Sequence, residues 1–550
     1  QDFLLKHCWA ESRLLAVGPL PAMRVPVPLL LSWVVISAAH EHAILLGTDV
    51  NPAGLGWEPV PLDLSYAHVP LDVMEGMVPA YLDGTLYRGA PGQWPDGWWL
   101  DGLITLNAFK FEGGRVTYSM QWSRDEAYNR TVAKAAPTPP LSNAPCQGCI
   151  PLPANSSFPT GVAFREVQGH LVSSTGVSNV NSVGFDTLEP LEMPFVFDDE
   201  LGAPYLAPTH EATVDGHVLH HLVTGVQKGS GGEPSYVVTS IKPGTRTREV
   251  IARIERPKES SPWNGLPSFQ HMPLATSDYY VMLEAPCYYP ETPNYVGHVD
   301  WTGWKSNPLA GGHVRLISRS TGESTVYPLS YSIFAIHHFN AYHDVASNSI
   351  IVDTIQLFPS VVPCSQAFKG LTMDNQVKKW RTAAFGLSMS KPLRLEIPLN
   401  EPGKTIKPVQ LTNISGVEFP TIGPAERNGK PYRHAYALWL SGRKSPFYDT
   451  LIKLDVQTGA YTSWHAEGHY PGEPIFVPDP QGSSEDDGVV MTNVLDVGRN
   501  VTYLLLLDAR TMTQTAKVGP TPHVIPHGYH GRYFPRKRQS NAESHVVAWV

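Results

Sequence analysis

Three stretches of the sequence decide the fold: VGFDTLEPLEM at 183–193, LISRSTGESTVYPL at 316–329 and LIKLDVQTGAYTSW at 451–464. Each is typical of a hairpin, with an aliphatic strand, a turn that contains a threonine and a second strand. The turn threonines lie 134 and 137 residues apart (Thr187, Thr321 and Thr458). If each interval holds two repeats of about 67 residues, the chain from residue 57 onward holds roughly seven repeats. This spacing predicts an all-β, seven-bladed propeller, with a pair of β-sandwiches as the alternative.

The composition agrees with one large, turn-rich domain. The 550 residues include 51 Pro and 46 Gly, and only 17% of them are charged. A hydrophobic fraction of 42% is enough for a sizeable core, which excludes a disordered or collagen-like chain. Beyond residue ~55 no linker or charge block divides the sequence. We therefore expect a single propeller domain over 57–535, followed by a C-terminal tail at 536–550.

Charge and motifs exclude several classes of function. The net charge is −9, and no stripe of Lys and Arg is present that would bind nucleic acid. No P-loop, strand-linked GxGxxG or GxSxG motif supports nucleotide binding or a nucleophilic serine. Five Cys exclude a disulfide scaffold and a Cys-rich zinc module. The single CxxC pattern, Cys146 and Cys149, lacks the second half of a metal site.

The N-terminal region contains a candidate targeting segment. From Met23 the sequence has one basic residue, an apolar run over 25–37 and then small residues, which is the outline of a signal peptide at 23–40. The run is shorter than the ~20 residues of a membrane span, and a chance apolar stretch is the alternative. Residues 1–22 are interpreted as an upstream extension outside the fold. We expect a secretory or organellar location, or alternatively a cytoplasmic protein bound peripherally to membranes. Four glycosylation sequons fit the secretory route (Asn129, Asn155, Asn413 and Asn500).

The sequence contexts of the 22 histidines are the strongest indication of chemistry in this chain. Three groups recur in Pro- or Gly-flanked, aromatic-rich stretches at 265–276, 334–344 and 521–534. No HExxH zinc motif is present.

Motifs spread along the chain resemble the carotenoid cleavage oxygenases, in the right order over 57–535. They include GTLYRGAPG (84–92), HHFNAY (337–342), GKPYRHAYAL (429–438), GEPIFVPDP (472–480) and PHGYHG (526–531). PSFQHM at 267–272 is most similar to the animal-type branch, the β-carotene oxygenases and the retinoid isomerohydrolase. The resemblance implies a seven-bladed propeller capped by loops and short helices, with one Fe(II) on the axis held by four histidines.

Position by position, the resemblance makes His210, His271, His337 and His530 the metal ligands. The gaps of 61 and 66 residues between the first three are close to the inferred repeat, so consecutive blades would each supply one imidazole. Neutral imidazole suits Fe(II), and four ligands leave positions open for O₂ or water. The family pattern places the ligand three residues before Asn340, which selects His337 over His338. Five other histidines are predicted to be non-ligands (His220, His221, His343, His523 and His527).

The family also uses three glutamates that accept the second ring N–H of ligand histidines. Glu418 in EFP and Glu473 in GEPIF match two of these positions. The third position is Gly176, so the N–H of His271 is expected to bond to water or to a backbone carbonyl. The family's Glu after NAY is replaced by His343.

The resemblance implies a non-haem Fe(II) dioxygenase that cleaves a conjugated C=C bond of a carotenoid or apocarotenoid to two carbonyl products. Its partners would be O₂ and an apolar polyene in a tunnel, for which Trp98, Trp99 and Phe334 are candidate lining residues. Alternatives are a retinoid ester isomerohydrolase, a catalytically impaired propeller that binds an apolar ligand, and a stilbene-cleaving oxygenase. Thr175, where the last class has Lys, argues against it.

Peripheral membrane contact is implied through an apolar loop, which 143–153 resembles. A glycan on the neighbouring Asn155 would conflict with such docking.

Overall fold

The computed structural model describes Gly56 and residues 58–93, 102–135, 160–201, 207–225, 233–256, 265–289, 305–306, 311–357, 389–423, 425–441 and 447–536. Contacts divide the chain into Gln1–Gly47 and Thr48–Val550, and every described residue belongs to the second unit. The predicted extension, the signal peptide and, apart from Arg536, the C-terminal tail lie outside the described residues. No helix in the described ranges is long and apolar enough to cross a bilayer.

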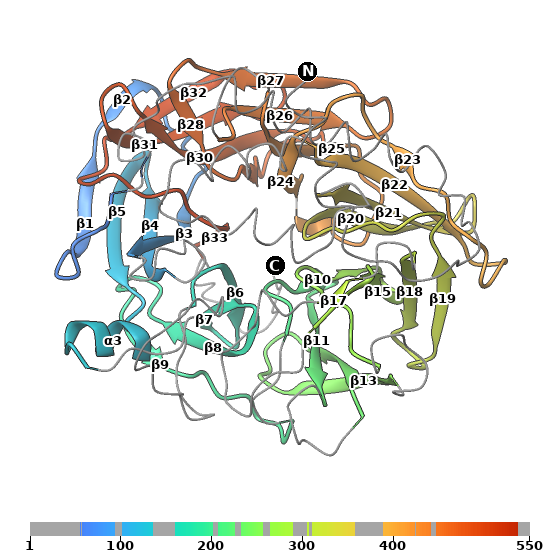
Figure 1. Cartoon of the computed structure of the whole chain (residues 1–550). Coiled ribbons are helices and arrows are strands. Elements are labelled where there is room, and N and C mark those ends of the chain that lie inside the picture. Colours follow the sequence, from blue (N-terminus) through green and yellow to red (C-terminus); the bar gives the residue numbers. More distant parts are fainter. Residues whose placement is uncertain are drawn as a thin grey trace, which may run out of the picture. The chain divides into compact units, whose positions relative to one another are not determined.

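Seven antiparallel sheets surround a central axis, so the predicted seven-bladed propeller is confirmed (Figure 1). Blade 1 contains β1 (Tyr66–Leu71), β3 (Gly84–Gln93), β4 (Leu103–Glu112), β5 (Arg115–Trp122) and β33 (Gly531–Pro535). Blade 2 contains β6 (Ala163–Val167), β7 (His170–Thr175), β8 (Val177–Val183) and β9 (Pro190–Glu192). Blade 3 contains β10 (Ala212–Val214), β11 (His217–Thr224), β12 (Ser235–Ile241) and β13 (Arg248–Glu255).

The remaining blades follow in chain order. Blade 4 contains β14 (Leu274–Ala275), β15 (Tyr279–Glu284), β18 (His313–Ser318) and β19 (Ser324–Pro328). Blade 5 contains β20 (His338–Asp344), β21 (Ser349–Gln356), β22 (Lys391–Pro398) and β23 (Val409–Gln410). Blade 6 contains β24 (Val417–Ile422), β25 (His434–Trp439), β26 (Thr450–Asp455) and β27 (Tyr461–His465). Blade 7 contains β2 (Val73–Gly76), β28 (His469–Pro471), β29 (Ile475–Pro478), β30 (Gly488–Asp496), β31 (Val501–Asp508) and β32 (Gln514–Val518).

The three hairpins quoted first are the outer edges of alternate blades. They correspond to β8–β9 in blade 2, β18–β19 in blade 4 and β26–β27 in blade 6. Their spacing therefore spans two blades each time, which is why halving it predicts the correct number of blades.

Strands from both chain ends close the ring. The C-terminal β33 pairs with β3 in blade 1, and the N-terminal β2 pairs with β32 in blade 7. Figure 1 shows the red β33 next to the blue β3. This exchange removes the open edges that an incomplete ring would leave between its first and last sheets.

The blades pack on each other through both faces of their middle strands. In β31, Leu504 and Leu506 join the core shared with blade 1, whereas Leu505 and Leu507 join the core shared with blade 6. All four side chains are fully buried. Because neighbouring strand residues point to opposite faces, the apolar run VTYLLLLD stabilises two interfaces at once, with about 1.5–3 kcal/mol for each leucine.

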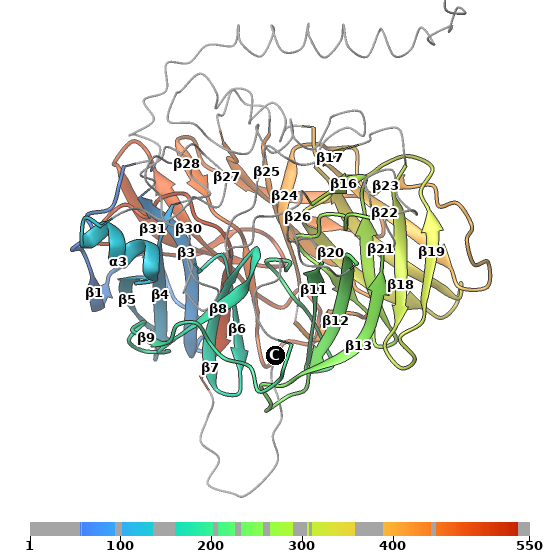
Figure 2. The ribbon, with the colours of Figure 1, turned by 60° about the horizontal axis from the view of Figure 1, so that its bottom comes forward.

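Helical structure is limited, within the described ranges, to α3 (Glu126–Val132) and the 3₁₀ turn η5 (Ala425–Arg427). Asp125 caps α3 by accepting a hydrogen bond from the Tyr128 N–H at 3.1 Å. The helix lies at the rim of the ring (Figures 1 and 2). A two-stranded sheet of β16 (Cys287–Tyr288) and β17 (Lys305–Ser306) completes the described elements. The helix-and-loop cap stays a prediction.

Candidate metal centre

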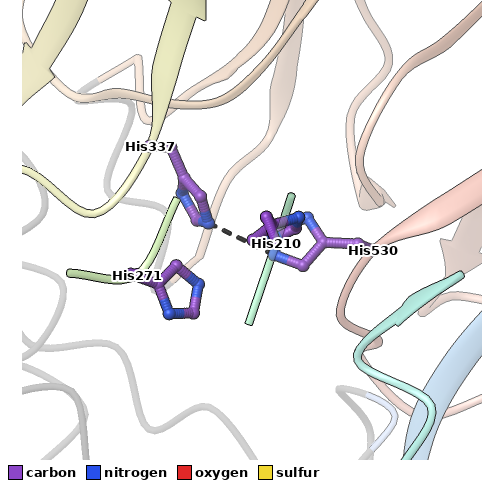
Figure 3. Close-up of side chains that lie close together, drawn as sticks. All are labelled: His210, His271, His337 and His530. Atoms are coloured by element: carbon purple, nitrogen blue, oxygen red, sulfur yellow. Dashed lines mark hydrogen bonds between the residues drawn. The ribbon is translucent and has the colours of Figure 1, made fainter. Parts of the chain in front are cut away.

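Four histidines converge on the propeller axis, each at the start of the innermost strand of a blade (Figure 3). His210 precedes β10, His271 precedes β14, His337 precedes β20 and His530 precedes β33. Residues at the strand starts of blades 3, 4, 5 and 1 therefore meet at one place. One ring nitrogen from each histidine lies within 4.8 Å of the others. Bonds of about 2 Å to one metal ion require nitrogens ~3–4 Å apart, so the cluster is close to a metal-binding arrangement.

Among the described residues, the inward nitrogens of three of the histidines have no hydrogen-bond partner outside the cluster. His337 Nε2 and His530 Nε2 face each other at 3.2 Å. His210 Nε2 is buried and has no hydrogen-bond partner among the described residues, and its ring centroid lies 4.2 Å from that of His530. A buried, unpartnered nitrogen is costly unless a further group binds it. This observation supports a metal ion at the cluster.

The outward nitrogens of two histidines are held by buried carboxylates. His337 Nδ1 donates to Glu418 Oε2 at 2.5 Å, and His530 Nδ1 donates to Glu473 Oε1 at 2.7 Å. Glu418 lies in β24 of blade 6 and Glu473 lies just before β29 of blade 7. Each carboxylate fixes the ring proton on Nδ1, which leaves the Nε2 lone pair available for a metal.

Glu473 is itself held by the neighbouring backbone and by Arg88. The Gly531 N–H donates to Glu473 Oε2 at 2.8 Å, and Arg88 Nη1 donates to the Glu473 carbonyl at 2.8 Å. A Cβ on Gly531 would lie 2.9 Å from both Arg88 Cγ and the Tyr87 carbonyl, so this position requires glycine. Burial raises the pKa of Glu473 to about 7, and the nearby Arg88 opposes that rise.

Glu418 is followed by a strained residue. Phe419 has φ +53°, at an irregularity in the pairing of β24 with β25. This conformation costs a non-glycine residue roughly 1–2 kcal/mol. It allows the Phe419 N–H to donate to Glu418 Oε2 at 2.7 Å and brings the Phe419 ring centroid to 5.3 Å from those of His337 and His530.

Three of the clustered histidines have lowered pKa values, which favours binding of a cation. Burial, reinforced by the neighbouring histidines, lowers the pKa values of His210, His271 and His530 well below the ordinary value. At pH 7 these imidazoles are therefore neutral, which is the form that binds metal. The donor set and its orientation fit one divalent metal ion.

The structure places His338 away from the cluster centre. His338 Nδ1 lies 2.7 Å from Thr354 Oγ1, and burial lowers its pKa to about 3. The ring nitrogens of His337 contact Glu418 and His530 instead, so the two neighbouring histidines have different partners. The histidines predicted to be non-ligands also lie outside the cluster (His220, His221, His343, His523 and His527).

The partner of His271 differs from the expectation of water or a backbone carbonyl. His271 Nδ1 lies 3.2 Å from Thr209 Oγ1, a residue that the sequence reasoning missed although it directly precedes His210. Phe334 reaches the site through an aromatic stack, since its ring lies 6.2 Å from that of Phe269, which lies 6.2 Å from that of His271. Trp98, Trp99 and the loop 143–153 lie outside the described residues.

Comparisons with known proteins show similarity over most of the chain. The family model described as "Retinal pigment epithelial membrane protein" (RPE65) matches residues 57–535. Carotenoid cleavage dioxygenase 8 homolog A of Oryza sativa subsp. japonica is 27% identical, with 84% of each chain covered. The mitochondrial carotenoid-cleaving dioxygenase of Homo sapiens is 25% identical, over 84% of this chain and 87% of the relative. A solved ACO/RPE65 chimera has a TM-score of 0.71 at 19% identity, over 88% of this chain and 99% of that chain. Cobalt-substituted Synechocystis ACO has a TM-score of 0.69 at 19% identity, over 88% and 98%.

Proposed function

The chain belongs to the family of retinal pigment epithelial membrane protein and the carotenoid cleavage oxygenases, and on that premise we propose that it is a non-haem Fe(II) dioxygenase. Its proposed reaction is cleavage of a conjugated C=C bond of a carotenoid or apocarotenoid. The observation that carries the proposal is the cluster of four buried or half-buried histidines on the axis. The carotenoid-cleaving relatives named above support the substrate class.

The reaction balances without a further reductant. The double bond breaks completely, each carbon gains one oxygen atom of O₂, and two carbonyl products result. Four histidines without a carboxylate ligand suit a first-row metal that imidazole binds, and O₂ chemistry favours Fe(II) over Zn(II), which has no redox chemistry. When bound, iron would supply the binding and activation of O₂.

The protein's own residues orient the ligands and exclude water. Glu418 and Glu473 keep the protons of His337 and His530 on Nδ1, so neither imidazole can turn its N–H toward the metal position. Phe419 packs beside these two histidines and Phe269 packs beside His271, which gives the centre an apolar border. Such a border favours an apolar polyene over water next to the open metal positions.

Cleavage can be tested directly with the purified, iron-loaded full chain. A panel of carotenoids, apocarotenoids and one retinoid ester is incubated briefly under ¹⁸O₂, with the His337→Ala variant as the control. We expect two carbonyl products from one substrate, each carrying one ¹⁸O atom, and none from the variant. Unlabelled, isomerised products from a retinoid ester would favour the isomerohydrolase alternative. The absence of any product from iron-loaded protein would contradict the proposal.

We also propose peripheral membrane contact and passage through the secretory pathway. Polyenes partition into bilayers, which supports the first. Cys287 is disulfide-bonded, and Asn413 and Asn500 are exposed, which support an oxidising, glycosylating compartment. A mass decrease on glycosidase treatment of the chain expressed in eukaryotic cells is expected. An unmodified chain with Cys287 as a free thiol would contradict the secretory route.

A further inference from the structure

The ring nitrogens that face away from the cluster are held unequally. His337 and His530 bond to carboxylates, whereas His271 Nδ1 lies 3.2 Å from the hydroxyl of Thr209. Thr209 is only 3% exposed, so water does not compete freely for this bond. If His271 binds a metal through Nε2, its ring proton stays on Nδ1. The Nδ1–H then donates a hydrogen bond to the Thr209 hydroxyl oxygen.

Gly176 adjoins this contact. A Cβ built on Gly176 would lie 3.4 Å from Thr209 Oγ1, and among the described residues no other heavy atom beyond its chain neighbours lies within 4 Å of it. A side chain at 176 would therefore point toward the same hydroxyl. Position 176 is where the family resemblance expects a glutamate, and the Thr209 hydroxyl lies within reach of a side chain at that position.

The backbone holds Thr209 between two blades. Ser174 Oγ, in β7 of blade 2, donates to the Thr209 carbonyl at 2.9 Å. The N–H of the next residue, His210, donates to the His271 carbonyl at 3.1 Å. These two bonds hold the peptide group between Thr209 and His210 in place, which limits the freedom lost when the Thr209 hydroxyl contacts His271.

We propose that Thr209 is the positioning residue of His271, replacing a carboxylate at position 176 with a neutral acceptor. The proposal rests on the proposed metal centre. A neutral hydrogen-bond acceptor raises the basicity of the imidazole less than a carboxylate does. His271 is therefore a weaker electron donor to the metal than His337 and His530. The centre also has one negative charge fewer around it than a site with three carboxylates.

The chain offers a matched control for the test. Thr354 Oγ1 lies 2.7 Å from Nδ1 of His338, and both of these side chains are buried like Thr209. Thr209→Val and Thr354→Val each remove one hydroxyl from one histidine at constant side-chain shape. His271, the partner of Thr209, belongs to the cluster, whereas His338, the partner of Thr354, does not.

Cobalt(II) is titrated into the metal-free full chain, and affinity and d–d absorption are recorded. We expect Thr209→Val to weaken binding about 3- to 10-fold, the range of one neutral hydrogen bond, and to shift the absorption bands. Thr209→Ser should keep the affinity and the absorption bands of the unmodified chain, because it keeps the hydroxyl. Thr354→Val should also leave the affinity and the bands unchanged. Unchanged binding in Thr209→Val, or an equal loss in Thr354→Val, would overturn the proposal. If the unmodified chain binds no cobalt(II), the proposed metal centre itself fails.

A second pair of variants tests the exchange between the two positions. Gly176→Glu combined with Thr209→Ala should bind cobalt(II) at least as tightly as the unmodified chain, while Thr209→Ala alone binds more weakly. Equal affinities of the double and single variants would show that a carboxylate at 176 does not reach His271, and would overturn the replacement.

Discussion

Changing Glu418 to Gln tests whether a carboxylate behind His337 strengthens metal binding. Glu418 is 1% exposed, and its Oε2 accepts both the His337 Nδ1–H at 2.5 Å and the Phe419 N–H at 2.7 Å. The carbonyl oxygen of Gln can keep both bonds, because the two side chains have the same shape. Its amide NH₂ would then take the place of Oε1, which is buried without a partner among the described residues.

The substitution therefore removes the negative charge of Glu418 and keeps the geometry of its two hydrogen bonds. A hydrogen bond to an ionised group is worth roughly twice a neutral one, so about 1–1.5 kcal/mol is lost from the His337 contact. That energy corresponds to ~5- to 13-fold weaker metal binding, at the lower end of the range typical for such partners. The unpartnered amide adds about 1–3 kcal/mol of destabilisation to the fold with or without metal.

Metal affinity is measured by competition with a chelator of known affinity, and unfolding is followed separately in urea. Glu467→Gln is the control, because the Glu467 side chain is fully exposed. Unchanged affinity in Glu418→Gln, with intact folding, would refute the assignment of Glu418 as the residue that orients His337.

Further substitutions test the choice of ligand, the close approach at Gly531 and a buried histidine outside the cluster. His337→Ala should lose bound iron, whereas His338→Ala should keep it at some cost in stability; metal analysis giving the reverse would show that the wrong neighbour was chosen. Gly531→Ala should lower the melting temperature and iron content together, because its Cβ would lie 2.9 Å from the Tyr87 carbonyl; a melting temperature equal to that of the parent would contradict the close approach. Burial lowers the pKa of His523 to about 4, below its unfolded value, so stability present above pH 6.5 is lost as the pH falls toward 4. We expect His523→Phe to remove about 2–3 kcal/mol of the loss between pH 7 and 4.5 in urea unfolding, and an equal loss in parent and variant would argue against this histidine.

The sequence predicts the blades well because propeller repeats leave a regular spacing. Thr187, Thr321 and Thr458 occupy equivalent outer hairpins, so their intervals report the blade period without any knowledge of pairing. The closure by β2 and β33 leaves no such signal, because each strand joins a blade whose other strands lie near the opposite end of the chain.

The contacts around the histidines are only partly accessible from sequence. Glu418 and Glu473 stand in recognisable motifs, and the structure places both against ring nitrogens of the cluster. Thr209 could not be found by motif, since its hydroxyl reaches His271 only through the way blades 2, 3 and 4 pack together. A threonine beside a histidine is common, and its direction depends on tertiary contacts rather than on local sequence.

X-ray absorption at the iron K-edge can show whether four histidines and no carboxylate bind one iron per chain. The iron-loaded full chain should contain one iron, with nearest neighbours at distances typical of nitrogen and the multiple-scattering pattern of four imidazoles. A carboxylate oxygen bound directly to iron in place of an imidazole, or a spectrum that His337→Ala leaves unchanged, would contradict the account.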